Sequence, residues 1–150
     1  MRLLRAYTVY ILKDILSINK LIIHTDGAAR GNPGPAAIGV TIKDETGKLV
    51  DTVSLRIGKA TNNQAEYQAI IAGLEKAAKF GAREVKVFSD SELAVKQING
   101  RYRVKNATLR ELYGKVVKLA GKLESFSIIH VRRARSAEAD SLANQALDKL

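Results

Sequence analysis

The chain has 150 residues, of which 46% are hydrophobic and 27% are charged, a composition that is typical of one globular domain and excludes a low-complexity class. It contains no cysteine and only two histidines, which excludes disulfides and cysteine-ligated zinc and leaves oxygen ligands, suited to Mg²⁺ or Mn²⁺, for any metal. Its 25 Lys and Arg against 15 Asp and Glu give a net charge of +10, which favours a polyanionic partner, nucleic acid before an anionic membrane.

The first segment, residues 1–19, is assigned to an N-terminal leader of unknown role, and residues 20–150 to one domain. The apolar stretch of the leader is short and is interrupted by Lys13 and Asp14, so it does not predict a transmembrane span. A small-residue cleavage site typical of signal peptides is also missing. An added strand, a short amphipathic helix and a disordered segment all remain open. The lack of cysteine fits a reducing compartment, and we expect a cytoplasmic protein.

The next three segments predict an antiparallel meander. An apolar run at 21–25 leads into Asp26 and a loop rich in Gly and Pro. Two further strands are predicted at 36–43 and 48–57, on either side of a tight turn at 44–47. In the segment 48–57, apolar residues recur with a period of roughly two, as they do in a strand with one buried face.

The second half alternates helices with strands. Thr61 and Gln64 have the spacing of a capping box, which predicts a helix that begins at Thr61 and ends near Phe80, before Gly81. The patterns that follow predict a strand at 84–90, a helix at 91–99, an amphipathic helix at 109–123, a strand at 125–131 and a final helix at 136–150. Strands that are joined through helices are expected to be parallel. The sequence therefore predicts a single-domain α/β fold, a mixed sheet with helices packed on it.

Two acidic residues follow apolar strands, at positions where another buried apolar residue would be expected. Asp26 and Asp90 each end an apolar strand, so both should lie at the carboxyl edge of the sheet, where ligand sites form in open α/β folds. Asp90 alone would be read as the N-cap of the helix that follows it.

Two further acids lie on predicted helices. Glu66 shares a face with small residues that would let its helix lie close to the sheet, and Asp140 lies in the first turn of the last helix. Each alone would be read as an acid that favours the helix dipole. Four acids at one edge would repel one another unless cations neutralise them. Two divalent ions about 4 Å apart can promote phosphodiester cleavage, so the pattern favours a metal-dependent nuclease.

Four segments, "HTDGAARGNPGPAAIGV", "TNNQAEYQAIIAGL", "VFSDSELAVKQING" and "HVRRARSAEADSLANQAL", resemble the conserved blocks of type 1 ribonuclease H in order and spacing. The resemblance covers about residues 20–150. It implies a five-stranded mixed sheet, an antiparallel three-strand meander plus two parallel strands, flanked by helices. It also implies cleavage of the RNA strand of RNA–DNA hybrids, with 5′-phosphate and 3′-hydroxyl products and two Mg²⁺ or Mn²⁺ ions. The catalytic, metal-binding acids of the family fall on Asp26, Glu66, Asp90 and Asp140.

The resemblance also implies residues that bind the substrate. Asn32, in the Gly-rich loop, and Thr61, Asn62 and Asn63 match segments that contact sugars, phosphates and base edges in the family. That loop lacks the spacing of a P-loop, so nucleoside triphosphate binding is not indicated. Ser91 is expected to contact substrate as well, although this chain has Asp-Ser-Glu where the family often has Asp-Ser-Gln.

The chain departs from the family in two loops. Many members carry a long basic protrusion after the helix that follows the fourth strand, and here that stretch is too short to hold one. We expect Arg101, Arg103 and Lys105 in this loop to contact phosphates instead. Some members use a histidine before the final aspartate, where this chain has none; Arg133 matches the arginine of a shorter-looped branch, with a role in phosphate contact or product release. A plain surface charge is the alternative for Arg133.

The two histidines are assigned no catalytic role. His24 alternates with core positions and is expected to face solvent, and His130 is expected to be structural.

Two other functions remain open. The same fold and acids could serve a Holliday-junction resolvase or part of a reverse transcriptase or transposase, although "TNNQAE" favours hybrid cleavage. A nucleic-acid-binding module without activity is disfavoured by the presence of all four acids. We expect a monomer that acts on an RNA–DNA hybrid, with no membrane and no obligatory protein partner.

Overall fold

The computed structural model describes residues 18–149, so nearly all of the expected leader lies outside the described residues. The elements, in chain order, are β1 (Lys20–Ala29), β2 (Gly34–Asp44), β3 (Leu49–Ala60), α2 (Asn62–Lys79), β4 (Glu84–Ser89), α3 (Glu92–Ile98), α4 (Ala107–Ala120), β5 (Ser125–His130), the short 3₁₀ helix η1 (Arg133–Ser136) and α5 (Ala137–Asp148). The predicted order of strands and helices is confirmed, and η1 is the one addition among the described residues.

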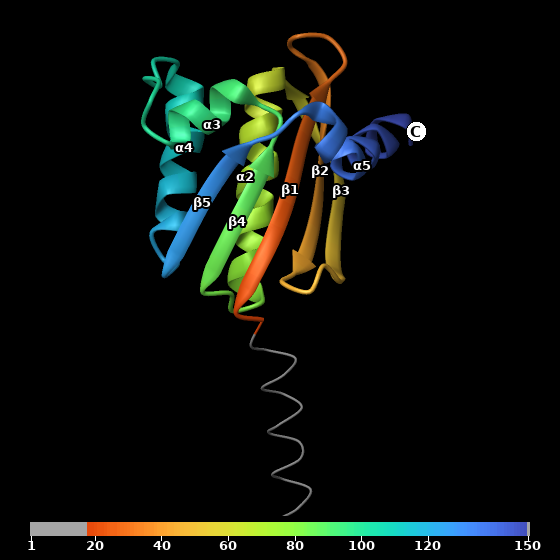
Figure 1. The fold of residues 1–150 in the computed structure, drawn as a ribbon. Helices are drawn as coiled ribbons and strands as arrows, with labels where there is room; N and C mark the ends of the chain where they lie inside the picture. Colours follow the sequence, from red (N-terminus) through yellow and green to blue (C-terminus); the bar gives the residue numbers. More distant parts are fainter. Residues whose placement is uncertain (1–17, 150) are drawn as a thin grey trace, which may run out of the picture.

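The strands form one mixed sheet in the order β3-β2-β1-β4-β5 (Figure 1). β1 pairs antiparallel with β2, and β2 antiparallel with β3, which is the expected meander. β4 pairs parallel with both β1 and β5. The predicted five-stranded mixed sheet is therefore confirmed, with β1 at its centre.

The helices cover both faces of this sheet. In Figure 1, α2 runs behind the sheet, and α5 lies at the right beside β2 and β3. On the α2 face, a Cβ added to Gly73 of α2 would lie 2.9 Å from Cγ2 of Ile23 and 3.5 Å from Cγ1 of Val40, so the helix packs directly on two core strands. The main core lies between the sheet, α2 and α4, and it includes Leu21, Ile23, Val40, Ile42, Tyr67, Ile70, Leu74, Val85, Val87, Leu109 and Val116. Among the described residues no helix is long and apolar enough to cross a membrane.

The first strand extends beyond the predicted end. We expected β1 to end at Asp26, whereas it continues to Ala29 because antiparallel pairing with β2 reaches Ala29 opposite Ala36. Parallel pairing with β4 stops earlier, at Thr25 opposite Ser89. Asp26 therefore lies inside β1, at the point where its β4 neighbour leaves the sheet.

The apolar face of α4 is narrower than its periodicity predicted. Leu109 and Val116 are buried, but Val117, which is also apolar, is 48% exposed. Val117 is the residue after the buried Val116, about 100° around the helix, and thus lies at the edge of the buried face of α4.

A carboxylate cluster beside the central strands

Three acidic side chains meet at the end of β4. Asp26 of β1, Glu66 of α2 and Asp90, which follows β4, each place one carboxylate oxygen within 4.8 Å of the others. These three residues are called the carboxylate cluster below. The parallel register that ends at Thr25 and Ser89 brings Asp26 and Asp90 side by side, since each is the next residue along its strand.

A glycine allows Glu66 to reach the other two acids. A Cβ added to Gly27 would lie 2.2 Å from the carbonyl carbon of Ala65 and 2.3 Å from the nitrogen of Glu66. Only a residue without a side chain can occupy this position while α2 rests on β1. The backbone contact therefore places Glu66 beside Asp26.

A second glycine brings α5 and Asp140 to the same place from the opposite face. Gly39 of β2 pairs with Asp26 of β1. A Cβ on Gly39 would lie 1.9 Å from the carbonyl oxygen of Ala139 and 2.7 Å from the nitrogen of Ala143, so α5 rests on the bare β2 backbone. Asp140 is not part of the carboxylate cluster, but it lines the same cavity.

This cavity, called the carboxylate cavity below, has a volume of about 400 Å³. Its wall comes from β1, the hairpin after it, α2, η1 and α5, and it includes Asp26, Arg30, Asn62, Glu66, Asp90, Arg133, Asp140, Asn144 and Leu147. Polar and charged groups therefore converge on one hollow from segments that are far apart in the chain.

The electrostatics of the cluster are unfavourable without a cation. Burial, then the charge of Asp90, then a hydrogen bond with Asp140 raise the pKa of Asp26 to about 8. Burial, then the charges of Asp26 and Asp90, raise the pKa of Glu66 to about 9. Oε2 of Glu66 and Oδ1 of Asp90 are buried and have no hydrogen-bond partner among the described residues. Buried carboxylate oxygens without donors fit a divalent cation, which prefers oxygen ligands and would remove the repulsion.

The predicted substrate residues at the start of α2 join this helix to the β1–β2 hairpin. The backbone N–H of Asn62 donates to Oδ1 of Asn32 (3.1 Å), and the N–H of Ala29 donates to Oδ1 of Asn62 (3.0 Å). Thr61 forms the predicted capping box with Gln64, which is confirmed by both of its hydrogen bonds. Asn62 lines the carboxylate cavity, and Asn63 is exposed beside it in sequence.

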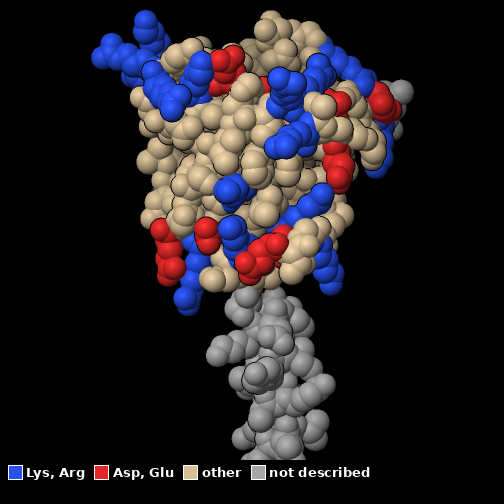
Figure 2. Space-filling view, viewed as in Figure 1, with Lys and Arg blue, Asp and Glu red and all other residues tan. Residues whose placement is uncertain are grey.

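The other predicted contacts are spread more widely. Ser91 caps α3, and its Oγ accepts a hydrogen bond from the N–H of Ala94 (3.2 Å). Arg101, Arg103 and Lys105 are exposed in the loop between α3 and α4 and do not line the carboxylate cavity. Figure 2 shows basic side chains extending from the upper left of the molecule, over this loop.

Arg133 lies at the cavity. It belongs to η1, and its Nη2 lies 3.5 Å from Oδ1 of Asp140, with 80% of its side chain exposed. The guanidinium is therefore only loosely paired with Asp140.

Two polar residues that line the cavity were not among the predicted site residues. Asn144 donates from Nδ2 to the carbonyl oxygen of Asp140 (3.0 Å), and its position four residues after Asp140 was a usable signal. Arg30 forms an ion pair with Asp148, a contact that no spacing in the sequence indicates because 118 residues separate the two.

Both expectations about the histidines were wrong. His24 is partly buried and stacks on Phe88, with ring centroids 4.9 Å apart, because η1 and α5 cover the face that was expected to be solvent. Burial and then the charge of Lys43 lower its pKa. His130 is exposed at the end of β5, where it is not part of the core formed by the described residues, so the structural role is not found.

The comparisons with known proteins agree with this architecture. A family model described as reverse transcriptase-like matches residues 24–146. Ribonuclease HI of Halobacterium salinarum is 46% identical over 123 residues, 82% of this chain and 62% of that protein. The crystal structure of RNase H1 from Halobacterium salinarum superposes with a TM-score of 0.86 at 42% identity and covers 88% of this chain and 100% of that chain.

Two further proteins are similar. Bifunctional protein Rv2228c of Mycobacterium tuberculosis is 44% identical over 86% of this chain, and the structure of its N-terminal RNase H domain has a TM-score of 0.84 and covers 99% of that domain chain. LC11-RNase H1, solved in complex with an RNA/DNA hybrid, is 46% identical with a TM-score of 0.82 and covers 86% of this chain and 97% of that chain. This chain spans 36% of the length of the mycobacterial protein.

Proposed function

The chain belongs to the type 1 ribonuclease H family, and we propose that it is a metal-dependent endonuclease that hydrolyses the RNA strand of RNA–DNA hybrids. The observation that carries this proposal is the carboxylate cluster, with its buried and unpartnered oxygens, in a chain whose net charge is +10. A related protein, LC11-RNase H1, binds an RNA/DNA hybrid, which supports the choice of substrate.

The carboxylate cluster and Asp140 are the proposed ligands of two divalent ions, Mg²⁺ or Mn²⁺. When bound, two such ions supply Lewis acidity at the attacking and the leaving oxygens of a phosphodiester. Asp26 and Glu66 keep protons at neutral pH when no cation is present, as their raised pKa values indicate, and release them when a cation binds. The rigid backbone contacts at Gly27 and Gly39 hold the acids in place before the substrate arrives.

Recognition of the hybrid is assigned to polar groups around the carboxylate cavity. Asn32 and Asn62 use their side-chain oxygens to join the hairpin to α2, and neither amide nitrogen donates a hydrogen bond to the described residues. These nitrogens, with Thr61 and Asn63, face the substrate as donors to sugars, phosphates and base edges. Contacts of this kind read groove shape and the 2′-hydroxyl rather than sequence.

Ser91 and the basic residues have a different proposed task. Ser91 and the exposed loop residues Arg101, Arg103 and Lys105 contact the sugar-phosphate backbones, and Arg133 contacts a phosphate or aids product release.

Cleavage leaves 5′-phosphate and 3′-hydroxyl ends. Residues 20–150 form the catalytic domain, residues 1–19 a leader, and the protein acts as a monomer in the cytoplasm.

The test is cleavage of an end-labelled RNA–DNA hybrid with Mg²⁺ or Mn²⁺, with Asp90→Asn beside the wild type. We expect the wild type to cut only the RNA strand, and the variant to lose nearly all activity while it still binds the hybrid. Duplex RNA and a four-way DNA junction serve as comparison substrates. Binding of the hybrid without cleavage by either metal, or preferred cutting of the junction, would overturn the proposal.

A further inference from the structure

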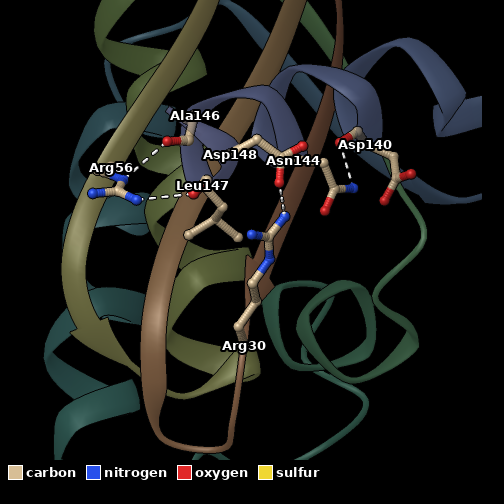
Figure 3. A network of polar contacts seen from close by, with 7 residues as sticks. All are labelled: Arg30, Arg56, Asp140, Asn144, Ala146, Leu147 and Asp148. Atoms are coloured by element: carbon tan, nitrogen blue, oxygen red, sulfur yellow. Dashed lines mark hydrogen bonds and ion pairs between the residues drawn. The ribbon is translucent and has the colours of Figure 1, made fainter. Parts of the chain in front are cut away.

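The C-terminal end of α5 is anchored by an arginine from another element (Figure 3). The last carbonyl groups of a helix have no partner within the helix. Arg56, on β3, donates from Nε to the carbonyl oxygen of Ala146 (2.9 Å) and from Nη2 to that of Leu147 (2.8 Å). The positive charge of Arg56 also attracts the negative, C-terminal end of the helix dipole. The contact is therefore favourable both through its hydrogen bonds and through this electrostatic attraction.

A second, weaker contact acts at the same end. Nη2 of Arg30, in the β1–β2 hairpin, pairs with Asp148 (Figure 3). Both side chains of this pair are largely exposed, at 49% and 67%, and exposed ion pairs contribute little to stability. Arg56 is therefore the main anchor of the two.

α5 also meets the sheet nearer its start. The carbonyl oxygen of Leu142 accepts a hydrogen bond from Oγ of Ser54 (2.6 Å), and Ala139 rests against Gly39. Ser54 and Arg56 are two residues apart on β3 and so reach α5 from the same face of the strand. Gly39 sets how near the helix lies to the sheet, whereas Arg56 holds its far end and so sets its direction across the strands.

This direction matters because α5 carries Asp140 to the carboxylate cavity. Asp140 lies six residues before Ala146, about 9 Å along the helix axis. Arg56 does not itself line that cavity. A shift of α5 across the sheet, or a rotation about its own axis, would move Asp140 relative to Asp26 without any change in Glu66 or Asp90.

We propose that Arg56 is a positioning residue for metal binding: through the carbonyl end of α5, the edge strand β3 holds Asp140 at the carboxylate cluster. This inference rests on the proposed function, because it assumes that Asp140 is a ligand of a divalent ion. It assigns a task to β3, which contributes no residue to the proposed ligand set.

The test is a double-mutant cycle on Mn²⁺ binding, measured by isothermal titration calorimetry without nucleic acid. We expect Arg56→Gln to weaken Mn²⁺ binding by about tenfold, at the lower end of the range for residues that orient metal ligands. In an Asp140→Asn background the same change should have no further effect, because the residue it positions has lost its charge. Arg83→Gln, at the opposite end of the sheet, removes the same charge and should leave Mn²⁺ binding unchanged.

Two more measurements separate positioning from general stability. Arg56→Lys keeps the charge and can donate to the same carbonyls without the guanidinium fork, so its affinity for Mn²⁺ should lie between those of wild type and Arg56→Gln. The KM for hybrid should stay the same in both variants when metal is saturating, since Arg56 is not assigned a substrate contact.

The inference fails if Arg56→Gln binds Mn²⁺ as tightly as the wild type, or if it weakens binding equally in the Asp140→Asn background. It also fails if Arg56→Lys binds no better than Arg56→Gln. A wild-type chain that neither binds Mn²⁺ nor cleaves hybrid would instead contradict the proposed function, so the two failures are distinguishable.

Discussion

Asp26 and Glu66 make the stability of the chain depend on pH. Their pKa values are raised to about 8 and about 9, above the ordinary values of 3.8 and 4.5, chiefly by burial. The folded chain without a cation therefore keeps protons that the unfolded chain releases. Because the folded state binds more protons, the free energy of unfolding decreases as the pH rises from about 4 to about 9.

We expect the melting temperature in the presence of a chelator to fall between about pH 5 and about pH 8, and to recover at the higher pH when Mn²⁺ is added. Glu66→Gln should melt with a smaller dependence on pH, because its amide does not ionise. Circular dichroism melts of both proteins across this range provide the measurement. A wild-type curve that falls no more steeply with pH than that of Glu66→Gln would contradict the raised pKa values.

Gly27 should tolerate no side chain. Gly27→Ala would place a Cβ 2.2 Å from the Ala65 backbone, so α2 must move away from β1. We expect a loss of about 1–3 kcal/mol in the free energy of unfolding, together with most of the hybrid cleavage, because Glu66 moves with the helix. Urea denaturation and the cleavage assay measure the two effects.

Gly114→Ala is the matched control for that substitution. Gly114 lies within α4, and a Cβ there would meet nothing within 4 Å. The change should stabilise the chain by up to about 1 kcal/mol, because Ala is the better helix former. Similar effects of the two substitutions would contradict the close approach of α2 to β1.

At the scale of elements, one buried network joins α2, α3 and the loop after α3. The hydroxyl of Tyr67 donates to Oε1 of Gln97 (2.7 Å), and Nε2 of Gln97 donates to the carbonyl oxygen of Arg103 (3.2 Å). Both side chains are buried, so each polar atom depends on its partner. The loop that presents the basic residues is therefore tied to the helix that presents Glu66.

Tyr67→Phe should cost about 1–3 kcal/mol of unfolding free energy, since it leaves a buried amide oxygen without a donor. We expect the KM for hybrid to increase as the loop loosens, while kcat at saturating hybrid stays near that of the wild type. Chemical denaturation and steady-state kinetics test both parts. An unchanged stability would show that Gln97 finds another donor.

At the scale of the whole molecule, the excess of positive charge should govern affinity for hybrid. Each lost phosphate contact reduces the slope of log K against log salt by about 0.7–0.9. If Arg101, Arg103 and Lys105 each contact a phosphate, a triple change to Gln should reduce the slope by about 2–3. Filter-binding with an inactive Asp90→Asn background measures this slope without cleavage.

The control removes the same charge from another surface. Lys115, Lys118 and Lys122 are exposed on and just after α4. If these three lysines contact solvent and not the hybrid, their triple substitution should change the slope less. Equal slopes for the two triple variants would mean that total charge, rather than the loop after α3, determines binding.

Much of this molecule was predictable from local patterns. The capping box at Thr61, the apolar periods and the Gly stops identify elements because they act between residues close in sequence. The three acids of the carboxylate cluster could be named for a related reason: an acid directly after a buried strand, or on a helix face of small residues, is expected near the strand ends, and the combination of such acids set them apart from ordinary caps.

The remaining features depend on contacts between distant parts of the chain. The extension of β1 to Ala29 arises from its pairing with β2, and the burial of His24 arises from η1 and α5 above it. The hydrogen bonds from Arg56 to α5 span about 90 residues, and no periodicity in either segment indicates the other. Local propensity specified which elements form, whereas close packing on Gly27 and Gly39 established how they meet, because backbone-to-backbone contact exists only once the chain has folded.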